Sequence, residues 1–276
     1  MDLNRSGVAA VMIRVMRASL AERVTFLAAG IAYYAFISII PLIVLLISIS
    51  SLVGGERLAA VVIGFLDHFL TPSAQELVHA AIVGGVGRAG ATTVSIFVFL
   101  WSGLKVFRGL DIAFSTVYGT VQEDSVVDHV VNVVTALLGI GFGIVLTVVI
   151  FTAVRLSPVG SLIGTLVSTV MLFIALSIVL FPMFYVFPSQ EISVREALPG
   201  TLLAAGGWTA LSALFNLYTS IAVTYLIYGV LGGILLLITI FYAGALILLI
   251  GAVTNAVLAG RSTASLEASM EDDALL

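Results

Sequence analysis

A long uncharged stretch of this chain constrains its fold more than any other feature. No aspartate, glutamate, lysine or arginine occurs between Ala197 and Gly260, where aliphatic residues and glycine predominate. A transmembrane helix needs only about 20 apolar residues, so this stretch is too long for one helix and must fold back once. We expect the break near Ala222 to Gly229. Such a sequence requires a bilayer as its solvent, and its peptide groups can then hydrogen-bond only within helices.

The composition of the 276 residues agrees with a membrane location. Hydrophobic residues make up 61% and charged residues 9% of the chain, whereas soluble domains have about half and about a quarter. We therefore predict an all-α, polytopic membrane helix bundle. The chain has no cysteine, which excludes disulfides, thiolate metal sites and cysteine nucleophiles.

Four other segments are candidates for membrane-spanning helices. They lie at Phe26–Val53, Ala89–Leu104, Val130–Val154 and Leu156–Phe187. Lys105 follows the second segment and can extend toward the lipid headgroups, which lengthens a span that is short by itself. With the two helices of the uncharged stretch, the prediction is about six transmembrane helices within residues 26–260.

The distribution of basic residues predicts the orientation, because cytoplasmic loops of membrane proteins are enriched in lysine and arginine. With a cytoplasmic N-terminus, the outer side carries only Arg57, Arg88 and Arg155. The cytoplasmic side then carries Arg5, Arg14, Arg17, Arg23, Lys105, Arg108, Arg195 and Arg261. We therefore expect both termini in the cytoplasm.

Three segments outside the predicted spans have a character of their own. Residues 1–25 mix arginines with apolar residues, as an interfacial helix on the inner leaflet does. Residues 56–88 contain two amphipathic stretches separated at Thr71 and Pro72, and we expect them to lie outside as helices against the membrane or the bundle. The acidic residues 261–276 are predicted to form a disordered cytoplasmic tail.

The second predicted helix and its cytoplasmic extension carry a candidate site. Trp101, Lys105, Arg108 and Asp111 recur at spacings of four, three and three residues, which places them along one face of a helix. Ionisable groups at membrane depth are costly and tend to mark function. One interpretation is a site for an anion or a lipid headgroup at the inner leaflet, with membrane lipids as partners. The other is an ordinary anchor in which Arg108 and Asp111 pair.

Polar residues also recur along the fifth and sixth predicted helices. The fifth carries Thr209, Ser212, Asn216 and Thr219, and the sixth carries Gly251 and Asn255 one turn apart. Such stripes either line a polar path or hydrogen-bond neighbouring helices in a dry interior. The candidate substrate-binding residues are Lys105, Arg108, Asp111, Asn216 and Asn255.

Signatures of enzymes, metals and nucleic-acid binding are absent from the sequence. The histidines are His68, His79 and His129, with no metal-binding or paired-carboxylate pattern near them, and no phosphate-binding glycine loop is present. The few, dispersed basic residues lack the electrostatic footprint of a nucleic-acid-binding protein. We therefore expect no enzyme activity, no cofactor, no metal site and no nucleic-acid partner.

Several longer motifs stand out between about Arg23 and Ala259. They are AAGIAYYAFISIIPLIVLLISI in the first helix, FPMFYVFPS at 181–189, REALPGTLLAAGGW ending at Trp208, FNLYTS from Phe215 and YLIYGVLGG from Tyr225. Together they resemble motifs of the YihY/BrkB family of inner-membrane proteins. The chain departs from many members at Ile240, where they carry tryptophan, and at Val253, where they carry glutamate.

The resemblance implies a multi-pass protein of the plasma (inner) membrane whose molecular activity is unassigned. Members have carried labels as different as virulence factor and a ribonuclease name, and we do not expect the latter to describe this chain. The missing glutamate at Val253 puts in doubt any coupling that depends on a carboxylate there.

Two main functional hypotheses follow. The first is a transporter or lipid-handling protein that moves a small or amphipathic solute, motivated by the polar stripes, the basic inner-leaflet face and the helix-breaking proline and glycines. The alternative is a structural or assembly factor of the cell envelope without transport activity, which uses residues 58–83 to dock an envelope protein, or forms a homo-oligomer. A membrane-bound hydrolase is a third hypothesis, and it requires two ionisable groups at one cavity.

Overall fold

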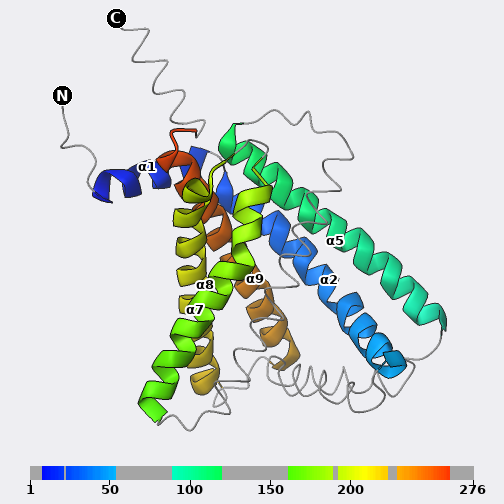
Figure 1. Cartoon of the computed structure of the whole chain (residues 1–276). Helices are drawn as coiled ribbons and strands as arrows, with labels where there is room; N and C mark the ends of the chain where they lie inside the picture. Colours follow the sequence, from blue (N-terminus) through cyan, green and yellow to red (C-terminus); the bar gives the residue numbers. More distant parts are fainter. Residues whose placement is uncertain are drawn as a thin grey trace, which may run out of the picture. The chain divides into compact units, whose positions relative to one another are not determined.

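The computed structural model describes residues 8–21, 23–53, 89–119, 161–188, 192–222 and 229–261. Within these ranges the chain forms helices and no strand (Figure 1): α1 (Val8–Ala21), α2 (Val24–Val53), α5 (Ala89–Tyr118), α7 (Ser161–Val186), α8 (Val194–Ala222) and α9 (Gly229–Leu258). The all-α class and the helical bundle predicted from the sequence are confirmed.

The helix boundaries follow the pattern of charges in the sequence. α8 ends at Ala222 and α9 begins at Gly229, so the uncharged stretch folds back where expected. α5 begins at Ala89 and continues past Lys105 to Tyr118, as the predicted second helix with its extension requires. The predicted helix at Val130–Val154, the external segment at 56–88 and the acidic tail beyond Arg261 lie outside the described residues.

Three helices of the described chain are long and apolar enough to cross a membrane. They are Leu166–Val186, Val194–Phe215 and Ile234–Leu258. Val11–Ala21 and Val24–Ile39 form a bent pair, which brings the number to four if the pair is one broken span. These spans fit the predicted membrane bundle. The expected total of six also includes the segment at 130–154, and it stays a prediction.

The described helices belong to two compact units. The first unit contains α1, the start of α2 through Ala28, α5 from Gly109, α7, α8 as far as Asn216 and α9 from Ala243. The second unit contains α2 from Ala29, α5 as far as Arg108, the end of α8 and the first part of α9 as far as Tyr242.

The interior of the first unit is rich in alanine, while many large aliphatic side chains point outward. Buried alanines include Ala18, Ala113, Ala175, Ala197, Ala204, Ala252 and Ala256. On α7 the exposed side chains of Leu166, Val170, Ile174 and Ile178 recur every four residues. Small residues let helices approach closely inside a membrane, and lipid solvates the large apolar side chains outside. This arrangement is typical of a membrane protein.

α8 and α9 run antiparallel and in close contact within the first unit. A Cβ placed on Gly207 would lie 2.6 Å from Ile247 Cγ2, and one on Gly244 would lie 2.5 Å from Trp208 Cζ2. Phe114 of α5 packs edge to face on Phe184 of α7, with ring centroids 5.8 Å apart. These contacts pair α8 with α9 and α5 with α7.

A residue in the left-handed conformation separates α1 from α2. Arg23 has φ of 51°, its N–H donates to the Leu20 carbonyl, and its own carbonyl accepts from the Phe26 N–H. A left-handed residue commonly ends a helix. The N-terminal helix expected within residues 1–25 therefore forms as an element of its own.

Candidate functional site

Two glycines of the first unit bring the backbones of α8 and α9 together. A Cβ on Gly200 would overlap the Gly251 carbonyl oxygen and lie 2.6 Å from Asn255 Nδ2. A Cβ on Gly251 would lie 2.7 Å from the Gly200 carbonyl oxygen and 2.9 Å from Phe184 Cζ. Real Cβ contacts are not this short, so both positions require glycine.

Asn255 uses both ends of its amide on the backbone of α8. Its Oδ1 accepts from the Gly200 N–H at 2.6 Å, and its Nδ2 donates to the Ala197 carbonyl at 3.1 Å. The residue is 1% exposed. Pro199 lies between these two partners inside α8 and has no N–H, so the helix lacks one internal hydrogen bond here. Asn255 thus clamps the two helices together, as expected if the polar stripes serve interhelical hydrogen bonds. We call this pairing of Asn255 with Gly200 and Ala197 the clamp.

The start of α8 and the end of α9 are both capped, and the caps meet. The Ser193 N–H donates to Glu196 Oε2 at 2.8 Å, and the Glu196 N–H donates to Ser193 Oγ at 3.3 Å, which is a capping box. α9 ends at Leu258 and is capped by Gly260, whose φ is 70°, with the Arg261 N–H donating to the Ala256 carbonyl at 2.8 Å. A partly exposed ion pair at 3.3 Å joins Arg261 Nη2 to Glu196 Oε1.

Tyr118 places a buried hydroxyl beside this clamp. It is 2% exposed, and its hydroxyl has no hydrogen-bond partner in the part of the chain that the structure describes. The nearby amide of Asn255 acts to lower the pKa of this phenol, but the hydrogen bonds of that amide go to Gly200 and Ala197. Burial, and then the negative charge of Glu196, raise the pKa of the Tyr118 phenol above its usual range. The hydroxyl is therefore neutral at physiological pH.

The hydroxyls of the predicted stripe on α8 bond within their own helix. Thr209 Oγ1 donates to the Ala205 carbonyl at 2.8 Å, and Ser212 Oγ donates to the Trp208 carbonyl at 2.9 Å. These two bonds satisfy the hydroxyl protons within the helix, and the choice between a polar path and interhelical hydrogen bonds stays a prediction for this stripe. Asn216 lies on α8, but its side chain lies outside the described part of the chain.

The candidate residues of α5 differ in burial and in unit. Asp111 belongs to the first unit, where it is buried and engaged in an interaction. Lys105 and Arg108 belong to the second unit, and the Arg108 side chain is exposed. The residues of the predicted face of α5 therefore differ in exposure, because Asp111 is buried and Arg108 is exposed.

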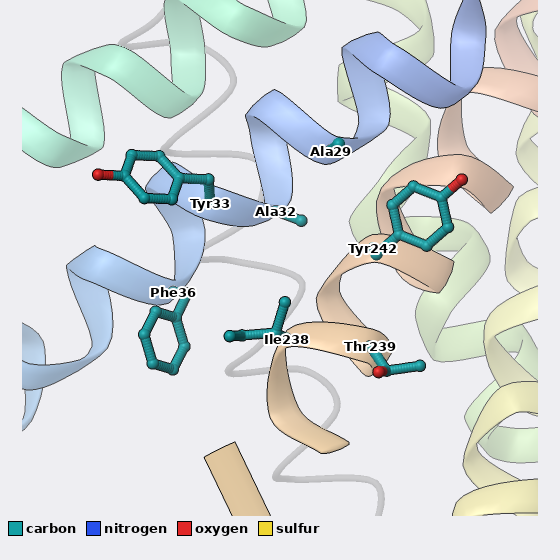
Figure 2. A pocket seen from close by; sticks show the side chains of 7 residues that line it. All are labelled: Ala29, Ala32, Tyr33, Phe36, Ile238, Thr239 and Tyr242. Atoms are coloured by element: carbon teal, nitrogen blue, oxygen red, sulfur yellow. The ribbon is translucent and has the colours of Figure 1, made fainter. Parts of the chain in front are cut away.

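An apolar groove lies between α2 and α9 in the second unit. It has a volume of about 260 Å³ and is lined by Ala29, Ala32, Tyr33, Phe36, Ile238, Thr239 and Tyr242. Figure 2 shows Ile238 projecting toward α2 on the side of Ala32 and Phe36. The Thr239 hydroxyl donates to the Leu235 carbonyl of its own helix at 2.8 Å, so it contributes little polarity. Of the α2 residues that line the groove, Ala29 and Ala32 fill little space, and Tyr33 and Phe36 contribute rings.

A series of aromatic rings leads from this groove to a cation. Tyr33 of the groove lies edge to face with Tyr34 at 5.3 Å between centroids, and Tyr34 lies edge to face with Trp101 at 6.5 Å. Lys105 Nζ is 6.0 Å from the centroid of the Trp101 ring, within reach of a cation–π interaction. Trp101 and Lys105, predicted on one helical face, are therefore together beside a groove that their spacing did not indicate.

Three features of these sites were missed in the sequence. The pair of Glu196 and Arg261 had a signal, because Ser193 and Glu196 form the S-x-x-E pattern of a capping box. Tyr118 and the groove had none, since both depend on contacts between distant helices. In the described ranges, no three His, Asp or Glu residues gather where they could hold a metal ion.

Comparison with known proteins places the chain in a family. A family model described as "Virulence factor BrkB" matches residues 15–275. The chain belongs to the BrkB family. A BrkB relative named for its likeness to ribonucleases, YfkH of Bacillus subtilis (strain 168), is 34% identical over 84 residues. That match covers 30% of this chain and 30% of YfkH. No solved structure matches the chain.

Proposed function

We propose that this BrkB-family membrane protein handles lipids, by binding an anionic amphipathic molecule such as a phospholipid and moving it within the membrane. The observation that supports this most is the apolar groove between α2 and α9 of the second unit. Its lining is alanine, phenylalanine, isoleucine, two tyrosines and one threonine, and it carries no charged side chain. Such a mainly apolar lining suits a hydrocarbon chain, whereas a hydrophilic solute needs more placed polar groups to fix its orientation.

The size of the groove favours part of a lipid over a whole solute. Its volume of about 260 Å³ is below the roughly 300–1,000 Å³ of pockets that enclose a drug-sized ligand. An acyl segment can occupy such a space while the rest of the molecule stays in the bilayer.

Lys105 supplies the charge that an anionic headgroup would meet. Its ammonium lies over Trp101, and the rings of Trp101, Tyr34 and Tyr33 connect it to the groove. Lys105 lies near the middle of α5. We propose that the part of α5 around Lys105 lies in the cytoplasmic half of the plasma membrane, with both chain termini in the cytoplasm, because most basic residues of the sequence then lie inside. Lysine and arginine near that leaflet attract anionic lipids.

A liposome assay tests the proposal. The purified protein is reconstituted with a trace of phospholipid labelled on an acyl chain, once with a choline and once with a glycerol headgroup, and label accessible to dithionite is followed over time. We expect Ala32→Phe and Ile238→Phe to slow transfer about tenfold by filling the groove, which corresponds to about 1.4 kcal/mol. Lys105→Gln should mainly reduce the preference for the anionic lipid.

Leu166→Phe is the matched control, because Leu166 is 67% exposed on α7 and does not line the groove. All variants are first checked for monodispersity and thermal unfolding in detergent. Transfer no faster than in protein-free liposomes, for both lipids, would contradict the proposal. It would leave the envelope assembly factor, which crosslinking from residues 58–83 can examine, as the better hypothesis.

A further inference from the structure

The described side chains of α1 divide into three sectors around the helix. Successive residues are 100° apart in an α-helix, so positions four apart fall close together. Ala18 is buried at 1% exposure, and Val11 and Val15 beside it are half-buried. This sector packs against the first unit.

A second sector of α1 is apolar and exposed. It consists of Met12, Ile13, Met16 and Leu20, which are 66%, 48%, 60% and 71% exposed. Four large apolar side chains on two turns form a contiguous patch, and such patches mark a contact with a partner or a membrane. Leucine and methionine on one face with charge on another are typical of helices that lie in the membrane interface.

The third sector is basic. Arg14 and Arg17 are both exposed and flank the apolar sector on one side only, with Ala21 between them around the helix. No acidic residue occurs in α1. A guanidinium group presents donors that match phosphate oxygens in pairs, so this flank is complementary to phospholipid headgroups.

The direction of α1 also fits a membrane surface. Figure 1 shows α1 lying across, not along, the direction of α7 and α8 in the first unit, at the end where α8 begins and α9 ends. The left-handed Arg23 ends α1, so it does not continue the axis of α2. If α7 and α8 cross the bilayer, then α1 lies along its surface.

We propose that α1 is a binding element for anionic phospholipid in the cytoplasmic leaflet. Met12, Ile13, Met16 and Leu20 insert among the acyl chains at the interface, and Arg14 and Arg17 contact the phosphates beside them. This surface is separate from the groove of the second unit, and its test does not depend on whether lipid is moved there.

The absence of cysteine from the chain makes site-specific labelling unambiguous. Met16→Cys on the apolar sector and Ala21→Cys on the basic sector are each labelled with an environment-sensitive fluorophore. The full-length protein is placed in nanodiscs of phosphatidylcholine, with or without phosphatidylglycerol, and quenching by acyl-chain spin labels is measured. We expect strong quenching at position 16, increased several-fold by phosphatidylglycerol, and little at position 21.

The double variant Arg14→Gln, Arg17→Gln, made in the Met16→Cys background, should remove the increase caused by phosphatidylglycerol. Both arginines are exposed, so their replacement leaves the core intact. Equal quenching at positions 16 and 21 would overturn the sided geometry. Quenching at position 16 that is equal with and without phosphatidylglycerol would overturn the recognition of anionic lipid. No quenching at position 16 in either kind of nanodisc would overturn the membrane contact and point to a protein partner instead.

Discussion

The side-chain oxygen of Asn255 accepts a hydrogen bond from the backbone N–H of Gly200 at 2.6 Å, across the interface of α8 and α9. The Nδ2 of the same residue donates to the Ala197 carbonyl, so one side chain serves two backbone groups of the neighbouring helix. Gly200 and Gly251 allow the backbones to approach closely enough for this. The pairing of an amide with two glycines therefore fixes how these helices meet.

Replacing Asn255 with leucine should destabilise the protein markedly. The change keeps the branching of the side chain, although leucine is larger, and leaves the Gly200 N–H and the Ala197 carbonyl without the amide. Removing one partner of a buried hydrogen bond costs about 1–3 kcal/mol. We expect a clear fall in the thermal unfolding temperature in detergent. Thr209→Val is the control and should change little, because Thr209 bonds to a carbonyl of its own helix. Equal effects of both variants would refute the clamp.

Replacing Gly200 with alanine should be at least as damaging, for a steric reason. The new Cβ would overlap the Gly251 carbonyl and approach the Asn255 amide, and neither is the free end of a flexible side chain. α8 and α9 must then separate, with a loss of about 1–3 kcal/mol as for other overpacked sites. Gly103→Ala is the matched control, since its Cβ would meet no described atom within 4 Å. Alanine in a helix should there stabilise by up to about 1 kcal/mol.

The helices themselves could be predicted because their signal is local. The uncharged stretch from Ala197 to Gly260 sets where α8 and α9 lie, and its break coincides with the end of α8 at Ala222 and the start of α9 at Gly229. The small-residue core could be anticipated in kind, since membrane helices pack through small residues. Which glycine faces which carbonyl depends on the rotation of each helix, and the sequence does not encode that locally.

The candidate site was predicted only in part for the same reason. Asn255 was identified because an amide in an apolar helix needs partners, but its partners lie on another helix. Trp101 and Lys105 were placed on one face by spacing alone. The groove escaped prediction, because Ala32 of α2 and Ile238 of α9 are brought together only by the fold of the second unit.

The buried hydroxyl of Tyr118 should make the protein sensitive to alkaline pH. Burial raises the pKa of this phenol in the folded state, whereas the pKa of a tyrosine in the unfolded chain is about 10. The folded state holds its proton more tightly, so the contribution to stability is complete below about pH 10 and is lost as the pH rises further. We expect the unfolding temperature to fall more steeply above pH 10 in the native protein than in Tyr118→Phe.

Near pH 7 the same variant should be close to neutral in stability. The Tyr118 hydroxyl has no hydrogen-bond partner among the described residues, so its removal breaks no bond and relieves the burial of a polar group. Other titrating groups are common to both proteins and cancel in the comparison. Parallel loss of stability in the two proteins from pH 8 to pH 11 would show that Tyr118 is not the titrating group.

Arg23 separates α1 from α2 in a conformation that favours glycine, so glycine at this position should give a more stable protein than alanine. The residue has φ of 51°, and a left-handed backbone costs about 1–2 kcal/mol for a residue with a Cβ. Arg23→Gly and Arg23→Ala both remove the charge, but only glycine relieves the strain. We expect the glycine variant to unfold later than the alanine variant, by about 1 kcal/mol in free energy, less the greater entropy of glycine in the unfolded chain. Equal stability of the glycine and alanine variants would show that the left-handed backbone at position 23 is not strained.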